Sequence, residues 1–220
     1  MADYQKINTL FKRDMSTNNI ILGDYTFPYF KTLETIEWEC TEKIDGTNIH
    51  IDIEWRDMND WSISFHGRTE RANIPAHLAT KLHQMFDNFN PNDVFTYKAP
   101  CTIQIFGEGY GVKIQKGGNY ISNDVDFILF DIRIGSMWLQ RESLENIASK
   151  MGVRIVPLIG YMTLWDAINL VKQGFVSLIS ENREYKAEGL VLKTKDGLLD
   201  RQGNRIITKI KTVDFENLKK

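Results

Sequence analysis

Short runs in which apolar and polar residues alternate are spread along the chain. Such alternation is typical of β-strands, because successive side chains of a strand point to opposite faces. Runs with alternation or with many β-branched residues predict strands over residues 48–55, 61–66, 101–106, 126–134, 189–193 and 205–211. The stretches KTKDG and DRQGN carry hairpin signals and join the last two runs. We therefore expect these two strands to be neighbours in one sheet.

Apolar residues recur three and four positions apart in three other segments, residues 78–89, 144–151 and 164–171, and this spacing predicts helices. Thr163 followed by Asp166 resembles a capping arrangement for the last helix, although Glu or Gln is the usual partner. Strands and helices follow each other irregularly, without a repeating strand–helix–strand order. We expect an α+β fold of antiparallel sheets flanked by helices.

The composition indicates a globular protein, since 220 residues with 42% hydrophobic and 25% charged side chains supply one large core or two small ones. There is no internal repeat, low-complexity tract or Pro/Gly/Ser linker, so we expect a single domain over residues 1–220. No apolar run approaches the ~18 residues of a membrane span, and the first residues lack the apolar region of a secretory signal. These features favour a cytoplasmic location and no membrane partner.

The net charge, the cysteines and the histidines give little indication of function. A formal net charge of −2 gives no global argument for nucleic-acid binding, which must then depend on local patches. Cys40 and Cys101 lie in apolar runs and are expected to be free, buried thiols. The histidines show no H-E-x-x-H spacing and the cysteines no C-x-x-C spacing, so no structural zinc site is predicted. We expect surface or ordinary core positions for His50, His66, His77 and His83.

The stretch CTEKIDGTNIHIDIEW places Lys43, Asp45, Gly46 and Asn48 between two strand-like runs. One interpretation is an ordinary turn with Asp-Gly at its tip. The other is a reactive lysine. A free lysine titrates near 10.4, so a lysine nucleophile needs nearby positive charge or desolvation to lose its proton at neutral pH.

Lys209 and Lys211 are one candidate source of that positive charge. They alternate in the run ITKIKTV and should therefore share a face of their strand. If that face lines a cleft, the two ammonium groups would favour the neutral amine of Lys43 and hold a phosphate. A solvated edge strand with protective lysines is the alternative.

Four other stretches offer further groups. Glu108 follows an apolar strand between Gly107 and Gly109, where the glycines would let the backbone approach a ligand; the alternative is a glycine-rich turn with an exposed Glu. Phe130 could stack on a purine or lie in the core. Glu188 begins a strand in AEGLVLK. Arg68 and Arg71 could clamp phosphate or be solvated.

The ordered set of these stretches resembles the covalent nucleotidyltransferases, which are the polynucleotide ligases and mRNA-capping enzymes. The matching stretches are Lys43–x–Asp45–Gly46, the Arg68 segment, FGEG, LFDI, EGLVLK and KIK, which correspond to motifs I, Ia, III, IIIa, IV and V and cover residues 42–211. Each motif alone is weak, whereas all of them in order make a strong case. Glu42 before the lysine and Asn48 after the glycine are most similar to RNA ligases of the phage, double-strand-repairing type.

The resemblance implies a fold in which the nucleotide lies in the cleft between the sheets, and it implies roles for the motif residues. Lys43 would attack the α-phosphorus of ATP to form a covalent lysyl-AMP. Glu42 would recognise the adenine edge, Phe130 would stack on the base, and Asp131 and Lys193 would have supporting roles. Mg²⁺, with Mn²⁺ possible as a substitute, would be positioned through waters by Asp45, Glu108 and Glu188. The nucleotide-binding positions implied are Glu42, Ile44, Asn48, Arg68, Glu108, Phe130, Glu188, Lys209 and Lys211.

The function implied is an ATP-dependent RNA ligase, in a phage-infected or other host cytoplasm, that transfers AMP to a 5′-phosphate end and seals the nick with a 3′-hydroxyl. The sequence ends nine residues after Lys211, so we expect no C-terminal OB or helical domain. Either local patches such as Lys113 and Lys116 or a partner protein would then hold the nucleic acid, or the sequence is the catalytic domain of a longer protein. The alternatives are a DNA ligase, a GTP-using capping-type guanylyltransferase, and a non-catalytic nucleotide- or RNA-end-binding module.

Overall fold

The computed structural model describes residues 4–69, 72–96, 100–115 and 120–218. Arg71 and Lys116, named above, lie outside the described residues. The chain forms two compact units, unit 1 with Met1–Tyr4 and Asp45–Val156, and unit 2 with Gln5–Ile44 and Pro157–Lys220. Each unit has its own sheet and its own hydrophobic core, which is the second of the two arrangements that the composition allows. The single domain expected over residues 1–220 stays a prediction.

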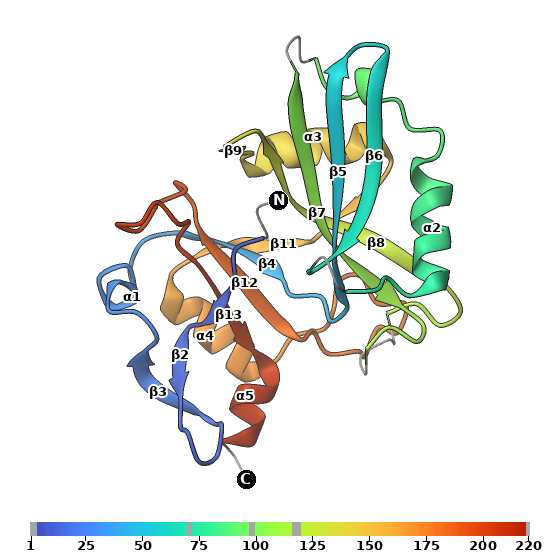
Figure 1. The fold of residues 1–220 in the computed structure, drawn as a ribbon. Coiled ribbons are helices and arrows are strands. Elements are labelled where there is room, and N and C mark those ends of the chain that lie inside the picture. Colours follow the sequence, from blue (N-terminus) through green and yellow to red (C-terminus); the bar gives the residue numbers. More distant parts are fainter. Residues whose placement is uncertain (1–3, 70–71, 97–99, 116–119, 219–220) are drawn as a thin grey trace. The chain divides into compact units, whose positions relative to one another are not determined.

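The sheet of unit 1 has the strand order β10–β8–β7–β5–β6, with β9 also paired to β8 (Figure 1). Its pairs are antiparallel except for the short parallel pair of β10 with β8. β5 forms a hairpin with β6 and a second long antiparallel pairing with β7, and the sequence of β5 alternates regularly along both pairings. The bounds are β5 Thr47–Asp57, β6 Asp60–Gly67, β7 Cys101–Gly111, β8 Val125–Ile134, β9 Met137–Trp138 and β10 Arg154–Ile155.

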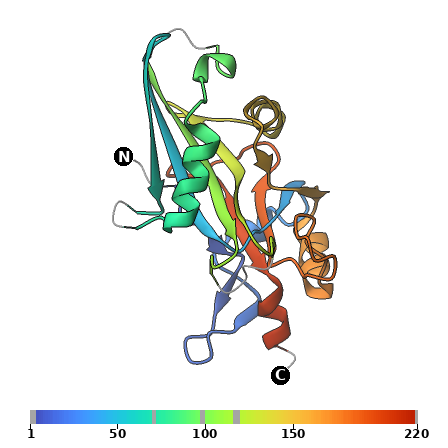
Figure 2. The same cartoon turned by 90° about the vertical axis from the view of Figure 1, so that its right-hand side faces the viewer.

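Helices α2 (Ala76–Phe86) and α3 (Arg141–Met151) belong to the core of unit 1, with the short 3-10 helix η1 (Pro91–Asp93) nearby in sequence. Ile49, Ile51 and Ile53 are fully buried and occupy one face of β5, where they share a core with the apolar stripes of α2 and α3. In Figure 2, α2 lies along the sheet. The alternate residues of β5 occupy the opposite face, which carries the polar groups of this unit.

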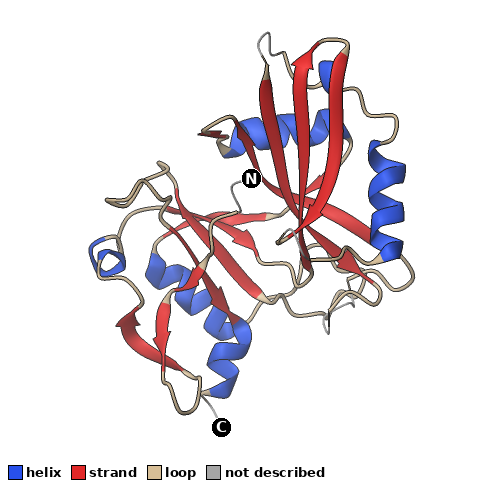
Figure 3. Cartoon of the chain, viewed as in Figure 1, coloured by secondary structure: helices blue, strands red, loops and turns tan. Residues whose placement is uncertain are grey.

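The sheet of unit 2 has the strand order β1–β13–β12–β4–β11. All its pairs are antiparallel except β1 with β13. Strands β2 and β3 form a separate hairpin, and strands and helices can be told apart by colour in Figure 3. The bounds are β1 Asn8–Thr9, β2 Phe11–Arg13, β3 Ile20–Tyr25, α1 Tyr29–Thr32, β4 Trp38–Glu42, β11 Leu158–Met162, α4 Leu164–Gln173, β12 Gly189–Thr194, β13 Ile207–Lys211 and α5 Thr212–Asn217.

One face of the unit 2 sheet is apolar and belongs to the core. Trp38 and Cys40 of β4 and Leu190 and Leu192 of β12 are fully buried there, together with residues of α4 and Phe215 of α5. The Thr163 side chain accepts a hydrogen bond from the Asp166 N–H at the start of α4, which confirms the predicted cap. Residues 39, 41, 191, 193, 209 and 211 alternate with the core residues and so lie on the other face of the sheet.

The predicted α+β class with mainly antiparallel sheets is confirmed, and each predicted strand and helix corresponds to an observed element. β7 continues five residues beyond the predicted end at residue 106, through Gly111, and β13 begins two residues later than predicted. Cys40 and Cys101 are free, as expected, but Cys101 is only partly buried. In the part of the chain that the structure describes, no helix is both long and apolar enough to cross a bilayer.

Candidate active site

The residues Lys43 to Gly46 connect two sheets and do not form a hairpin. β4 ends at Glu42 in the sheet of unit 2, while β5 begins at Thr47 in the sheet of unit 1, and the two strands are not paired. Gly46 is not among the residues with positive φ, so the type I′-like turn is excluded as well. A Cβ at Gly46 would lie 2.3 Å from the Gly109 carbonyl oxygen and 2.8 Å from Cγ of Glu108. The glycine is therefore needed because another strand passes close to it.

Lys43 is held by Glu188, and Glu188 also holds Lys211. The Lys43 Nζ donates a hydrogen bond to Glu188 Oε2 at 2.6 Å, and Lys211 Nζ lies 2.7 Å from Oε1 of the same carboxylate. The side chains of Lys43 and Glu188 are 19% and 16% exposed, so this ion pair is partly shielded from solvent. Two ammonium groups and one carboxylate leave a net positive charge at this place.

Backbone pairing explains why these three side chains meet. The Lys43 N–H donates to the Gly189 carbonyl, and Gly189 is paired with Lys211 on its other side. Gly189 has φ +150°, and a Cβ there would lie 2.0 Å from the Ile210 carbonyl oxygen. Only glycine fits this position, so no side chain stands between the two lysines. Glu188, the preceding residue, reaches both.

Lys209 lies on the same face of β13 as Lys211, as the alternation predicted. The alternative of a solvated edge strand is wrong for this position, because β13 is flanked by β12 and, at Thr208 and Lys209, by β1. Lys209 pairs with Val191 of β12 and with Thr9 of β1. Its cationic side chain therefore belongs to an interior strand of the sheet.

Glu42 is almost fully buried and accepts hydrogen bonds from two residues that the sequence did not indicate. Ser177 Oγ donates to Oε1 at 2.5 Å, and the Leu178 N–H donates to Oε2 at 2.8 Å. Burial raises the pKa of Glu42, and the two hydrogen bonds act in the opposite direction. In this arrangement Glu42 fixes the segment around residue 177, so adenine recognition by Glu42 stays a prediction.

Ile44, two residues after Glu42, is buried. Its carbonyl oxygen accepts a 3.4 Å hydrogen bond from Lys43 Nζ.

Unit 1 brings together Asn48, Glu108 and the Gly46 segment. Asn48 of β5 is paired directly with Glu108 of β7, and both are partly buried on the polar face of the sheet. Asp45, at the start of this segment, donates its N–H to the Tyr120 hydroxyl at 3.0 Å. Arg68 is exposed and follows the last residue of β6, which pairs with Ile49. These predicted residues thus lie at one end of strands β5, β6 and β7.

The glycines around Glu108 serve the core. Glu108 lies inside β7, so the alternative of an exposed turn residue is wrong. A Cβ at Gly107 would lie 2.3 Å from the Phe127 ring, and one at Gly109 would lie 2.3 Å from Leu78 Cδ2. The expectation that both glycines let the backbone approach a ligand is therefore wrong, because core side chains fill the space beside them.

Phe130 occupies a β-bulge in β8. Phe106 pairs with Asp131 while its neighbour Gly107 pairs with Leu129, which leaves Phe130 as the extra residue. Its ring is partly exposed and meets the Tyr4 ring edge-on, with centroids 5.1 Å apart. The Tyr4 hydroxyl also donates to Asp131 Oδ2 at 2.8 Å. The bulge thus turns two consecutive side chains toward Tyr4, a partner that no sequence pattern indicated.

The predicted residues therefore fall into two groups. Unit 2 contains Lys43, Glu188 and Lys211 in direct contact, with Lys209 on the same face of the sheet and Glu42 turned to Ser177. Unit 1 contains the second group, which consists of Asp45, Asn48, Arg68, Glu108 and Phe130.

Comparison with known proteins shows to which family this chain belongs. A family model described as RNA ligase matches residues 36–211, well over half of the chain. The chain belongs to the RNA ligase family. All the motif residues named above, from Glu42 to Lys211, lie within the matched part of this RNA ligase-family chain.

Similar folds are found among solved structures of the Naegleria gruberi RNA ligase. A mutant form with ATP and Mn gives a TM-score of 0.63 at 18% identity and covers 100% of this chain and 58% of that chain. The form with PPi gives 0.61 at 20% identity, covering 98% and 64%, and another mutant form with ATP and Mn gives 0.59 at 18% identity, covering 97% and 61%. At these identities the likeness shows a shared RNA ligase fold. This RNA ligase-family chain spans about three fifths of those ligase chains.

Proposed function

We propose that this chain is an ATP-dependent RNA ligase that acts through a covalent lysyl-AMP at Lys43. The observation that carries the proposal is the Glu188 carboxylate shared by Lys43 and Lys211 on one face of a sheet, in a chain of the RNA ligase family. Support for the nucleotide comes from the Naegleria gruberi RNA ligase, whose solved forms include complexes with ATP and Mn and with AMP and Mn.

The first reaction step forms a bond between Lys43 Nζ and the α-phosphorus of ATP and breaks the bond from that phosphorus to the leaving pyrophosphate oxygen. The Lys43 nitrogen gives up a proton, since the product is a neutral phosphoramidate nitrogen. In a second step an oxygen of a 5′-phosphate attacks the phosphorus of AMP, the bond from that phosphorus to Lys43 Nζ breaks, and the nitrogen takes up a proton. In a third step a 3′-hydroxyl loses its proton and attacks the phosphorus of the 5′-phosphate, and AMP leaves. Phosphoryl chemistry of this kind depends mainly on positioning and charge stabilisation.

Glu188 and Lys211 set the state of the nucleophile in unit 2. The carboxylate positions Nζ, which attacks as a neutral amine. Lys211 contacts the other oxygen of the same carboxylate, so its positive charge lies next to the nucleophile. Lys211 and Lys209 then stabilise the negative charge that develops on the α-phosphate.

The donors implied for the metal fit a hard cation, because Asp45, Glu108 and Glu188 are carboxylates and Mg²⁺ and Mn²⁺ prefer oxygen ligands. When bound, the ion supplies positive charge against the phosphates and the departing pyrophosphate. We propose that Asp45 and Glu108, both in unit 1, hold the ion through waters. Glu188 is proposed as an oxygen donor of unit 2, where it contacts Lys43 and Lys211. The contact of Gly46 with Glu108 brings Asp45 and Glu108 to neighbouring positions of unit 1.

The finer features of the proposal concern nucleic acid and cell biology. We propose that the substrate is nicked or double-stranded RNA, that the enzyme is of the phage, double-strand-repairing type, and that it works in the cytoplasm. The motif EKIDGTN supports this choice of type. A partner protein that helps to hold the RNA is also proposed, and sealing by the purified chain alone would exclude the need for one.

The test is covalent labelling. Purified protein is incubated with magnesium and α-labelled ATP or, separately, GTP, and denatured before label on the protein is measured. We expect label from ATP, none after Lys43→Ala, and normal label after Lys195→Ala, which removes a lysine of the same unit that is ion-paired to Glu37. Label from GTP instead would favour a capping-type guanylyltransferase. No label from either nucleotide in folded protein would leave the non-catalytic binding module.

The substrate is tested by sealing. Nicked duplexes with RNA or with DNA on the 3′-hydroxyl side, and labelled 5′-phosphates, are incubated with ATP and the protein. We expect joined product mainly from the RNA nick. Equal or preferred joining of DNA would identify a DNA ligase.

A further inference from the structure

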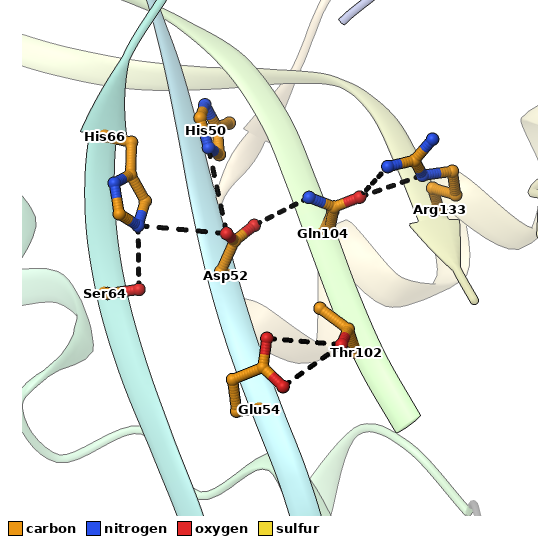
Figure 4. A network of polar contacts seen from close by, with 8 residues as sticks. All are labelled: His50, Asp52, Glu54, Ser64, His66, Thr102, Gln104 and Arg133. Carbon is orange, nitrogen blue, oxygen red and sulfur yellow. Dashed lines mark hydrogen bonds and ion pairs between the residues drawn. The ribbon is translucent and has the colours of Figure 1, made fainter. Parts of the chain in front are cut away.

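A second group of polar residues lies on the polar face of the unit 1 sheet, beside the FGEG and Arg68 stretches, since His50 is paired with Phe106. His50 and Asp52 are two residues apart on β5, and His66 of β6 is paired directly with His50. One ligand atom from each of the three lies within 4.8 Å of the others (Figure 4). We propose that His50, Asp52 and His66 form a binding site for a transition-metal dication such as Zn²⁺, distinct from the metal needed for adenylylation.

The distances fit such an ion. Nε2 of His50 and Nε2 of His66 each lie 3.8 Å from Oδ2 of Asp52. Two atoms that bind one zinc ion at ~2.0–2.2 Å lie ~3.4 Å apart at the tetrahedral angle, so each His–Asp pair has to close by a few tenths of an ångström. The imidazole rings are stacked, with centroids 4.8 Å apart and an angle of 18° between their planes. The ligand nitrogens of the two rings lie within 4.8 Å of each other.

The carboxylate is held in the orientation that the ion requires. Gln104 Nε2 donates to Asp52 Oδ1 at 3.0 Å, and the other end of Gln104 accepts hydrogen bonds from Arg133. Figure 4 shows Gln104 on one side of Asp52 and the two imidazoles on the other. With Oδ1 engaged by Gln104, Oδ2 faces the histidines. Outer-shell hydrogen bonds of this kind are a usual feature of metal sites.

Charge and access also favour a dication. Asp52 is only 2% exposed, and burying a carboxylate is costly without positive charge next to it. His66 and Ser64 are the accessible members of the group, so an ion can enter from their side and keep a water as a further ligand. Two imidazoles with one carboxylate suit zinc and related ions, whereas Mg²⁺ prefers oxygen ligands alone.

The site would join β6, the edge strand of the sheet, to β5. His66 is two residues before Arg68, so a bound ion would fix the end of β6 from which Arg68 extends. The ligands come from alternate residues of one strand and a residue paired across from it. This spacing differs from the helix and loop patterns that sequence motifs for zinc describe, which is why the histidines were expected to be ordinary.

The experiment is isothermal titration of the whole chain with zinc chloride, in the absence of ATP and magnesium. We expect one zinc ion per chain and a loss of affinity of more than about 100-fold in His66→Ala, since even outer-shell changes cost about 10–100-fold. His83→Ala is the matched control, because His83 is an exposed histidine of the same unit paired to Asp87. Its affinity should equal that of the unmodified chain.

Ser64→Ala provides a second discriminating variant. Ser64 Oγ lies 2.9 Å from the same Nε2 of His66 that would bind the ion, so its removal should leave zinc affinity unchanged or improve it. Absence of stoichiometric zinc binding by the unmodified chain, or equal binding by folded His66→Ala, would overturn the proposal. Either result is independent of the labelling of Lys43, since no nucleotide is present.

Discussion

Replacing Lys211 by alanine separates catalysis from stability. The Lys211 side chain is 31% exposed and makes its ion pair at the end of β13, so its loss should lower the free energy of unfolding by about 1 kcal/mol or less. For a chain of this size that corresponds to a fall in Tm of at most about 4 °C. The effect on adenylylation should be much larger. Removing one preorganised donor to developing charge typically costs ~10²–10³ in rate, about 3–4 kcal/mol.

Two effects of the Lys211 change act in the same direction. The α-phosphate loses a positive charge, and two unit charges ~4 Å apart interact by about 4 kcal/mol at an effective dielectric constant of ~20. Glu188 also loses its second ammonium partner and then holds the Lys43 ammonium more strongly. We therefore expect Lys211→Ala to slow the formation of lysyl-AMP by about 100-fold or more while it stays folded.

The assay is single-turnover labelling with α-labelled ATP at saturating concentration, followed by thermal unfolding of the same samples. Lys195→Ala is the matched control, because it also removes an ion-paired lysine from unit 2 and should not change the labelling rate. A Lys211→Ala protein that labels at the normal rate would refute the assignment. A protein that loses labelling and unfolding midpoint together would show that the ion pair has a structural role instead.

Two further predictions concern binding and pH. Phe130→Ala should raise the ATP concentration for half-maximal labelling by about 5- to 150-fold, because base stacking contributes ~1–3 kcal/mol. The Tm should fall little. A large loss of Tm without a change in the ATP requirement would mean that the ring is a core residue. Glu42→Gln should change the pH dependence of stability, because burial raises the pKa of Glu42 and folding therefore favours its protonated form. The stabilisation from protonated Glu42 is fully present below its ordinary pKa of 4.5 and is lost as pH rises through its raised pKa in the folded state. As pH falls from 7 toward 4.5, the urea midpoint of the unmodified chain should therefore rise relative to the urea midpoint of Glu42→Gln. A difference between the two midpoints that does not change with pH would contradict this.

Regular alternation was sufficient to predict the long strands, and short length explains why several others were missed. β5 shows strictly alternating apolar residues from Ile49 to Trp55 because one face is core and the other polar. β4, Trp38–Glu42, does alternate apolar and polar residues, but it has only five residues and all of them are buried. β1, β9 and β10 have two residues each, which is too short for any periodicity.

The candidate site was predicted as residue types but not as contacts. Lys43, Glu188 and Lys211 were each named from short motifs, yet the shared carboxylate depends on pairing between strands about 145 positions apart in sequence. Ser177 and Tyr4 gave no signal, because a serine and a tyrosine in irregular segments are common. The glycines around Glu108 carried a correct signal of close packing, but the sequence alone did not show that core side chains occupy the space.

The bulge at Phe130 has a consequence for how this position can vary. The residues on either side, Leu129 and Asp131, are fully buried and keep their own pairings, so the inserted residue can change without moving them. A substitution there removes the ring that meets Tyr4 and leaves the pairing of β7 with β8 intact. Residue 130 is therefore a place where the sequence can drift at little cost to the sheet.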